Sequence, residues 1–121
     1  MADSRQIMIV DDDPVVLDAM QRLLVLWGYS TIAFSRFDEA RASLATQSPD
    51  ALIVDIRLGE YNGLQLVHLA KRSNPSMAIV VVSGFEDPVL RNEAIQAGAV
   101  YLLKPTEFQR LREYLPSPTA S

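Results

Sequence analysis

Near its amino terminus the chain reads Ile7-Met8-Ile9-Val10-Asp11-Asp12-Asp13-Pro14, an apolar stretch followed by three carboxylates and a proline. The apolar part has the character of a buried strand, and the proline ends it. Adjacent carboxylates repel one another, and the end of a buried strand also removes part of their water. We therefore expect a cation beside these side chains and partners for them elsewhere in the chain.

Composition narrows the class of protein. The chain has 121 residues and is 49% hydrophobic, which suits one globular domain with its own core. Its net charge is −4 and it has no run of Lys and Arg, so we expect no direct binding to nucleic acid or to a membrane surface. It has no cysteine, which excludes thiolate metal sites and thiol catalysis. No apolar run approaches the about 18 residues that span a bilayer, and we predict a cytoplasmic protein.

Strand-like and helix-like patterns alternate along the whole chain. Apolar runs predict strands at 7–10, 29–34, 51–54, 78–82 and 100–103. Apolar residues at helical spacing between and after them predict helices at 14–27, 37–45, 64–73, 88–97 and 107–115, whereas 57–63 is predicted to be a loop. Pairs with N-cap character precede four of these helices: Asp13 with Pro14, Ser35 with Asp38, Asp87 with Pro88, and Thr106 with Gln109.

This alternation forces parallel strands joined by right-handed crossovers, with helices on both faces of the sheet. We predict a single α/β domain of the flavodoxin-like class. It is a doubly wound (βα)5 unit whose five-stranded parallel sheet has the order 2-1-3-4-5. Residues 1–115 form the domain, and 116–121 are a tail or the start of a linker. Trp27 and Phe108 are expected in the core, and His68 is expected at the surface without a role.

Polar side chains follow four of the predicted strands: Asp11 with Asp12, then Asp55, Ser83 and Lys104. Because the carboxyl ends of parallel strands meet at one edge, we expect these groups to converge. Carboxylate oxygens without nitrogen or sulfur ligands favour Mg²⁺. A hydroxyl and an ammonium beside them would stabilise a phosphoryl group in transfer. Asp55 stands alone at the centre of the sheet, so it is the expected nucleophile.

The chain resembles the receiver domain of bacterial two-component response regulators. The matching features are Val10-Asp11-Asp12, Asp55 with Gly63, Ser83-Gly84, and Tyr101 ahead of Lys104-Pro105. The resemblance implies that Asp55 accepts a phosphoryl group from a phosphohistidine of a sensor histidine kinase or of a histidine phosphotransfer protein in a phosphorelay. A downstream effector domain or protein would then read the change.

The resemblance also implies roles for single residues. Asp12, Asp55 and the backbone carbonyl of Arg57 would bind Mg²⁺, and Asp11 would assist. Lys104 would pair with the phosphoryl oxygens. Ser83 would hydrogen-bond one of them, and Tyr101 would swing inward as Ser83 moves. The surface of the fourth helix, fifth strand and fifth helix would then change shape. Such a domain is not an enzyme in the usual sense, although it assists its own phosphorylation and dephosphorylation.

The sequence departs from the family pattern in several places. Gly59 stands where the family usually has proline, and we expect it to loosen the loop that carries Arg57. Ser83 replaces the commoner threonine but keeps the hydroxyl. Arg57 and Phe85 lie at positions that influence how long the phosphoryl group survives. The last helix is short, which weakens the case for a homodimer through this face.

Two other functions fit parts of the sequence. Asp11 to Val15 also matches the D-x-D-x-[TV] pattern of haloacid-dehalogenase-type phosphohydrolases, with Asp11 as nucleophile and Asp13 as acid/base. That reading leaves Asp55 unexplained and lacks a later acidic motif. A pseudo-receiver, which binds partners without phosphorylation, is the other alternative.

Overall fold

The computed structural model describes residues 4–104 and 107–119 of the chain. In chain order the elements are β1 (Gln6–Val10), α1 (Pro14–Leu26), β2 (Ser30–Phe34), α2 (Phe37–Thr46), β3 (Ala51–Asp55), β4 (Arg57–Leu58), β5 (Tyr61–Asn62), α3 (Leu64–Ser73), β6 (Ala78–Ser83), α4 (Pro88–Gln96), β7 (Val100–Leu103), the 3₁₀ helix η1 (Phe108–Arg110) and α5 (Leu111–Tyr114). No helix in the described ranges combines the length and apolar character needed to cross a membrane.

The main sheet is parallel and has the strand order β2-β1-β3-β6-β7. Because β4 and β5 form a separate pair, this order corresponds to the predicted 2-1-3-4-5, and the predicted fold is confirmed. In the register of β1 and β3, Val10 pairs with Val54. The next residues, Asp11 and Asp55, therefore leave neighbouring strands at the same edge of the sheet.

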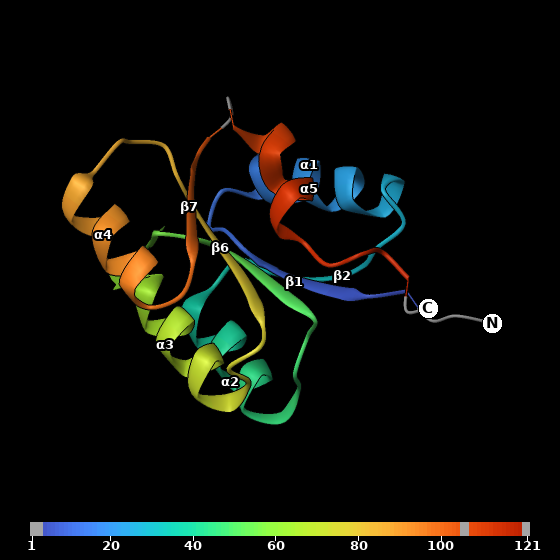
Figure 1. The fold of residues 1–121 in the computed structure, drawn as a ribbon, viewed down its shortest axis with the longest axis horizontal. Coiled ribbons are helices and arrows are strands. Elements are labelled where there is room, and N and C mark those ends of the chain that lie inside the picture. The colour runs from blue at the N-terminus through green and yellow to red at the C-terminus, as the bar shows by residue number, and fades with distance from the viewer. Residues whose placement is uncertain (1–3, 105–106, 120–121) are drawn as a thin grey trace.

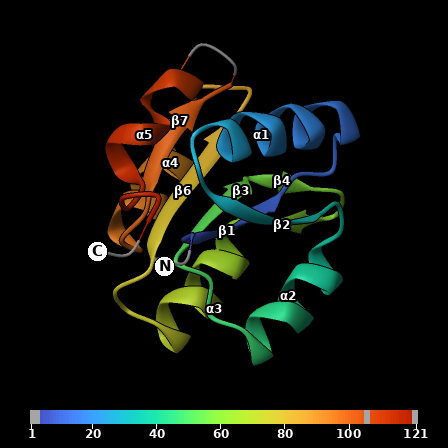
Figure 2. The same cartoon turned by 90° about the vertical axis from the view of Figure 1, so that its right-hand side faces the viewer.

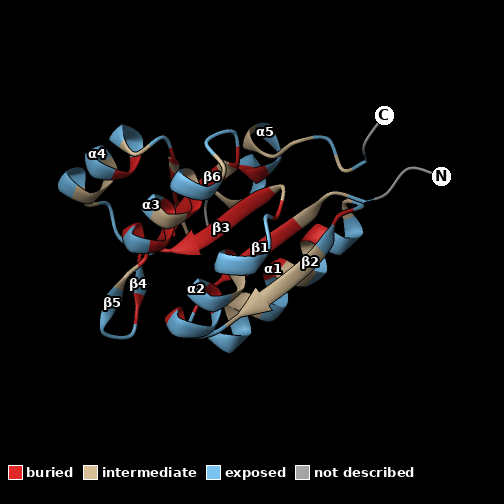
Figure 3. Cartoon of the chain, turned by 90° about the horizontal axis from the view of Figure 1, so that it is seen from below, coloured by how far each residue is buried: buried red, intermediate tan, exposed pale blue. Residues whose placement is uncertain are grey.

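Helices cover both faces of this sheet, with α1 and α5 on one side and α2, α3 and α4 on the other (Figure 1). Figure 2 shows the sheet between α1 and the layer of α2 and α3. Side chains alternate between the two layers: Ile7 and Ile9 pack toward α1, whereas Met8 and Val10 pack toward α2 and α3. The apolar residues of β1 and β3 are buried, and β2 lies at the edge with intermediate exposure (Figure 3).

The helix ends follow local chemistry at most positions. Asp13 and Asp87 cap α1 and α4 as predicted, because each carboxylate accepts a hydrogen bond from an amide of the first turn. The predicted capping box of Ser35 and Asp38 is wrong. The N-cap of α2 is Arg36, without a side-chain cap, because burial of the Phe37 ring in the core sets where this helix begins. The predicted cap at Thr106 lies outside the described residues.

Two other expectations need correction. Residues 57–63 are not a plain loop, since β4 and β5 form an antiparallel hairpin that projects beyond the main sheet (Figure 3). Trp27 is not fully in the core. It is the C-cap of α1 and only half-buried, and the Arg112 guanidinium lies 4.9 Å from its ring centre. The last helix is short, as expected, and consists of a 3₁₀ turn followed by one α turn.

The chain after α5 runs back along the start of the fold. The Tyr29 hydroxyl donates to the carbonyl oxygen of Pro116, and the Arg5 amide donates to that of Pro118 at 2.8 Å. Ser4 and Thr119 form an isolated antiparallel bridge. Residues 116–119 are thus held against the first strand, while a domain boundary at 115 stays a prediction.

Candidate phosphoacceptor site

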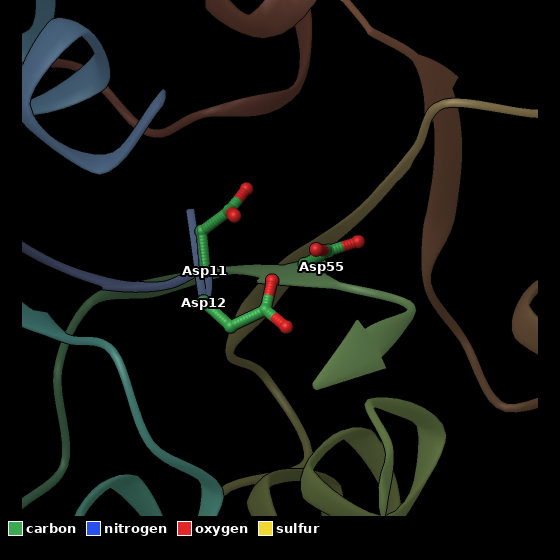
Figure 4. A group of neighbouring side chains, drawn as sticks. All are labelled: Asp11, Asp12 and Asp55. Carbon is green, nitrogen blue, oxygen red and sulfur yellow. The ribbon is translucent and has the colours of Figure 1, made fainter. Parts of the chain in front are cut away.

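Three carboxylates meet at the carboxyl ends of β1 and β3 (Figure 4). Asp11, Asp12 and Asp55 each offer one oxygen, and these oxygens lie within 4.8 Å of one another. Asp11 is fully buried and Asp55 is 7% exposed, whereas Asp12 is exposed. Asp12 and Asp55 border a cavity of about 260 Å³ that is also lined by Asp13, Ile56, Arg57, Ser83, Gly84, Phe85 and Lys104.

Lys104 reaches the cluster from the end of β7. Its Nζ atom lies 2.7 Å from Oδ2 of Asp11 and 3.2 Å from Oδ2 of Asp55. The Lys104 amide also donates to the carbonyl oxygen of Ser83, which fixes the two strand ends to each other. The ammonium group therefore bridges the two buried carboxylates and offsets part of their repulsion.

Burial and charge perturb both groups of this ion pair. Desolvation raises the pKa of Asp55, and the Asp11 carboxylate raises it further, against the lowering effects of Lys104 and of the Arg57 amide. For Lys104, burial lowers the pKa. The hydrogen bond to Asp11 and the charges of Asp55 and Asp11 outweigh that effect, so its pKa is raised. Lys104 thus stays a cation. The ionised form of Asp55, in contrast, is destabilised by its surroundings when no metal is bound.

Ser83 and Tyr101 are linked through the loop that follows β6. The Ser83 hydroxyl donates to the carbonyl oxygen of Phe85 at 3.0 Å and accepts from the Phe85 amide at 3.2 Å. The Tyr101 hydroxyl donates to the same Phe85 carbonyl at 2.8 Å, and its ring is 3% exposed. The Arg91 guanidinium lies 4.7 Å from the centre of that ring. Tyr101 is therefore already in an inward position, and its movement stays a prediction.

Two glycines shape the backbone next to Asp55. A Cβ atom on Gly63 would lie 2.1 Å from the carbonyl oxygen of Asp55, so no side chain fits there without moving the backbone of the expected nucleophile. Gly59 has a φ of +60° and sits in the two-residue turn of the β4–β5 hairpin, at the position where type II′ turns favour glycine. It closes a paired hairpin, and the expected loosening of the segment stays a prediction.

The remaining predicted residues lie where the sequence suggested or have structural roles. Asp13 caps α1, with its Oδ1 accepting from the Val15 amide at 3.0 Å. The Arg57 amide donates to Oδ1 of Asp55 at 3.3 Å, and the Arg57 guanidinium lies 5.2 Å from the centre of the Phe85 ring. His68 is exposed on α3.

The chemistry of the carboxylate cluster fits a hard divalent cation such as Mg²⁺, because it offers several oxygens and no nitrogen or sulfur.

Sequence reasoning missed the hairpin and its contacts. The Gly59 amide donates to Oδ2 of Asp12 at 3.2 Å, and the Tyr61 ring stacks on Phe37 with ring centres 4.4 Å apart. The signal in the sequence was the Gly59-Glu60 pair between Leu58 and Tyr61, which is too short to predict a hairpin by alternation alone.

With this geometry in place, comparison with known proteins identifies the class. The chain matches the response regulator receiver domain family over residues 7–116, and it belongs to that family. It is 35% identical over 116 residues to the transcriptional regulatory protein ZraR of Salmonella typhimurium, an alignment that covers 94% of this chain and 26% of ZraR. It is 36% identical over 108 residues to the alginate biosynthesis transcriptional regulatory protein AlgB of Pseudomonas aeruginosa, covering 88% and 24%. The chain spans about a quarter of the length of these curated relatives.

Solved structures agree with this assignment. A response regulator protein from Burkholderia pseudomallei, crystallised with a phosphorylated aspartic acid, a calcium ion and citrate, superposes with a TM-score of 0.85 at 25% identity, over 93% of this chain and 67% of that one. A CheY-like receiver domain from Methanospirillum hungatei gives a TM-score of 0.84 at 26% identity, over 92% and 93%.

Proposed function

We propose that this chain is the phosphoacceptor domain of a two-component system and that Asp55 receives the phosphoryl group. The observation that carries the proposal is the convergence of Asp11, Asp12 and Asp55 with the Lys104 ammonium, at the strand ends of a receiver-family fold. The crystal structure of a similar response regulator protein from Burkholderia pseudomallei contains a phosphorylated aspartic acid and a calcium ion, which supports the same chemistry here.

In the proposed reaction a carboxylate oxygen of Asp55 attacks the phosphorus of a phosphohistidine. A P–O bond forms and the P–N bond breaks, and its electron pair stays on the imidazole, which takes up a proton. The product is an acyl phosphate on Asp55. Hydrolysis of that acyl phosphate by water returns the carboxylate and releases inorganic phosphate. In this proposal the residues around Asp55 assist both the phosphorylation and the dephosphorylation of the domain.

The charge of the transferred group needs cations near Asp55. Asp11, Asp12, Asp55 and the Arg57 carbonyl would hold Mg²⁺, which supplies positive charge to the phosphoryl oxygens when bound. Lys104 already lies 3.2 Å from Asp55, and we assign it to the phosphoryl oxygens after transfer. Ser83 would exchange its bond to the Phe85 carbonyl for one to a phosphoryl oxygen. Tyr101 shares that carbonyl, so the exchange would alter the surface of α4, β7 and α5.

The alternative functions are weaker on this geometry. For a haloacid-dehalogenase-type mechanism Asp11 would be the nucleophile. Asp11, however, is fully buried, with one oxygen bonded to Lys104 and the other accepting from the Asp13 amide at 2.9 Å. Asp13 is engaged as a helix cap. A pseudo-receiver would not need the complete set of Asp55, Lys104 and Ser83 that the site retains.

The partners follow from the reaction. A sensor histidine kinase or a histidine phosphotransfer protein would donate the phosphoryl group in the cytoplasm. A downstream effector domain or protein would read the altered surface. Direct contact of this domain with nucleic acid or membrane is not part of the proposal, and a homodimer through the short α5 is an open alternative.

Intact-mass measurement tests the proposal. The protein is incubated with Mg²⁺ and either acetyl phosphate or phosphoramidate. We expect one phosphoryl adduct on the wild type that requires Mg²⁺ and is lost in base, and none on Asp55→Asn. An equal adduct on Asp55→Asn would show that the acceptor is another residue.

A further inference from the structure

The β4–β5 hairpin is attached to α2 by an aromatic pair that lies outside the expected reaction centre. Phe37 and Tyr61 are stacked, with an angle of 10° between their rings and 4.4 Å between their centres. Phe37 is the first residue of α2 and is buried, whereas Tyr61 lies in β5 and is half exposed. A half-exposed tyrosine that is held flat on a buried ring is fixed in place by that contact.

The hairpin connects Tyr61 to the expected metal ligands. Tyr61 pairs with Leu58 and Asn62 pairs with Arg57, so a shift of Tyr61 moves the backbone of Arg57. Between the two strands, Gly59 donates its amide proton to Oδ2 of Asp12 at 3.2 Å. A shift of Tyr61 would therefore move both the Arg57 backbone and the Gly59 amide that is hydrogen-bonded to the Asp12 carboxylate.

The Phe37–Tyr61 stack and the Asp12 carboxylate also line the same cavity. A hollow of about 250 Å³ is lined by Asp12, Phe37, Leu58, Gly59 and Tyr61, among others. Leu58 is 3% exposed and anchors one side of the hairpin in the core, while Tyr61 anchors the other side on Phe37. Without the stack, the hairpin would lose its aromatic contact with α2 and keep the burial of Leu58 and the Gly59–Asp12 hydrogen bond.

We propose that Phe37 and Tyr61 are positioning residues for Mg²⁺: their stack fixes the hairpin that orients Asp12 through the Gly59 amide and holds the Arg57 backbone in place. The inference rests on the proposed function of the site. It replaces the expectation that Gly59 leaves this segment loose, because the hairpin supplies the order that a proline would otherwise give.

The test uses ¹⁵N-labelled protein and follows amide signals during Mg²⁺ titration. Tyr61→Ala removes the stack but no metal ligand, and Tyr61→Phe keeps the stack. Val25→Ala is a matched control, because Val25 is 58% exposed and lies near the far end of α1. We expect Tyr61→Ala to move the Gly59 amide signal before metal is added, and to weaken Mg²⁺ binding about 3- to 10-fold. Tyr61→Phe and Val25→Ala should match the wild type in both readouts.

The outcomes separate the inference from the proposed function. If Tyr61→Ala leaves both the Gly59 signal and the Mg²⁺ dissociation constant unchanged, the positioning role is wrong while the site stands. If Tyr61→Phe loses as much affinity as Tyr61→Ala, the stack is not the cause and the inference also fails. If the wild type binds no Mg²⁺, the proposed function fails together with the metal role, although a Gly59 shift in Tyr61→Ala would still show that the stack orients the hairpin.

Discussion

Ser83 and Tyr101 donate hydrogen bonds to the same atom, the carbonyl oxygen of Phe85, at 3.0 and 2.8 Å. A carbonyl oxygen has two lone pairs and can accept both bonds. If Ser83 turns toward a phosphoryl group on Asp55, it leaves this oxygen and Tyr101 keeps it alone. The shared acceptor is therefore a direct physical connection between the reaction centre and β7.

This connection predicts the behaviour of Ser83→Ala. The variant should still bind Mg²⁺, because no metal ligand is lost. Its phosphorylation by acetyl phosphate should be about 10-fold slower, since one hydrogen bond to the transferred group is missing. The Tyr101 ring signals should not respond to phosphorylation, as measured by NMR. Ser83→Thr keeps the hydroxyl and should restore both properties; a normal Tyr101 response in Ser83→Ala would disprove the coupling.

Lys104→Ala separates the binding of metal from the stabilisation of phosphoryl. The ammonium of Lys104 now offsets the charge of Asp11 and Asp55. Its removal should leave Mg²⁺ affinity unchanged or about 3-fold tighter, since a competing cation is gone. Phosphorylation should slow by about 100-fold. NMR titration and intact mass measure the two effects, and loss of Mg²⁺ affinity would contradict the division of roles.

The fluorescence of Trp27 would respond poorly to Mg²⁺ binding at this site. Trp27 is the C-cap of α1, whereas the site lies beyond the other end of this helix, at Asp13. At 1.5 Å per residue, a helix of 13 residues separates the two positions by about 20 Å. Amide signals of the site itself are the better measurement.

Asp55→Asn should make the metal-free protein more stable at neutral pH. Burial and the Asp11 charge raise the pKa of Asp55 in the folded state. The contribution of Asp55 to the stability of the fold is therefore fully present below the pKa of the unfolded chain, and it is lost as pH rises through the pKa of the folded state. Removing the charge should raise the free energy of unfolding by about 1 kcal/mol, which corresponds to an increase of about 4 °C in Tm. Thermal melts with EDTA should show this gain shrinking as pH falls through the raised pKa of Asp55, because Asp55 in the wild type then becomes protonated. A gain that grew at acid pH would contradict the sign.

Gly59→Pro, which introduces the residue common at this position in the family, should destabilise this chain. Proline requires a φ near −65° and has no amide proton, whereas Gly59 has a φ of +60° and donates to Asp12. We expect the free energy of unfolding, measured in urea, to fall by about 2 kcal/mol, and Mg²⁺ binding to be weaker. Gly59→Asn tolerates the left-handed conformation and keeps the amide, so it should lose less than half as much. A stabilising Gly59→Pro would show that the hairpin turn is not required.

The sequence allowed most of the fold, and the convergence of the candidate site residues, to be predicted for identifiable reasons. Apolar runs such as 51–54 and 78–82 are buried on both faces and carry a strong strand signal, and the Asp–Pro pairs at 13–14 and 87–88 fix two helix starts locally. The sequence points to Asp11, Asp55, Ser83 and Lys104 because each lies at the end of a strand or directly after it, and parallel strands bring their carboxyl ends together.

Features that depend on tertiary contacts were missed. Phe37 starts α2 because its ring enters the core, which local capping patterns at Ser35 and Asp38 do not reveal. The β4–β5 hairpin packs on α2 through the stack of Phe37 with Tyr61, two residues from separate elements. The shared bond acceptor at Phe85 is a backbone atom, and no sequence pattern identifies it.

The most direct test of the account is to locate the phosphoryl group. After phosphorylation with acetyl phosphate and Mg²⁺, borohydride reduces an aspartyl phosphate to homoserine, and trypsin then cleaves after Arg and Lys. Cleavage at these residues places Asp55 in the peptide 42–57 and Asp11 in the peptide 6–22. We predict homoserine at position 55 of peptide 42–57 and none in peptide 6–22. Homoserine at position 11, or the absence of homoserine from both peptides in protein that carries a phosphoryl adduct, would contradict Asp55 as the acceptor.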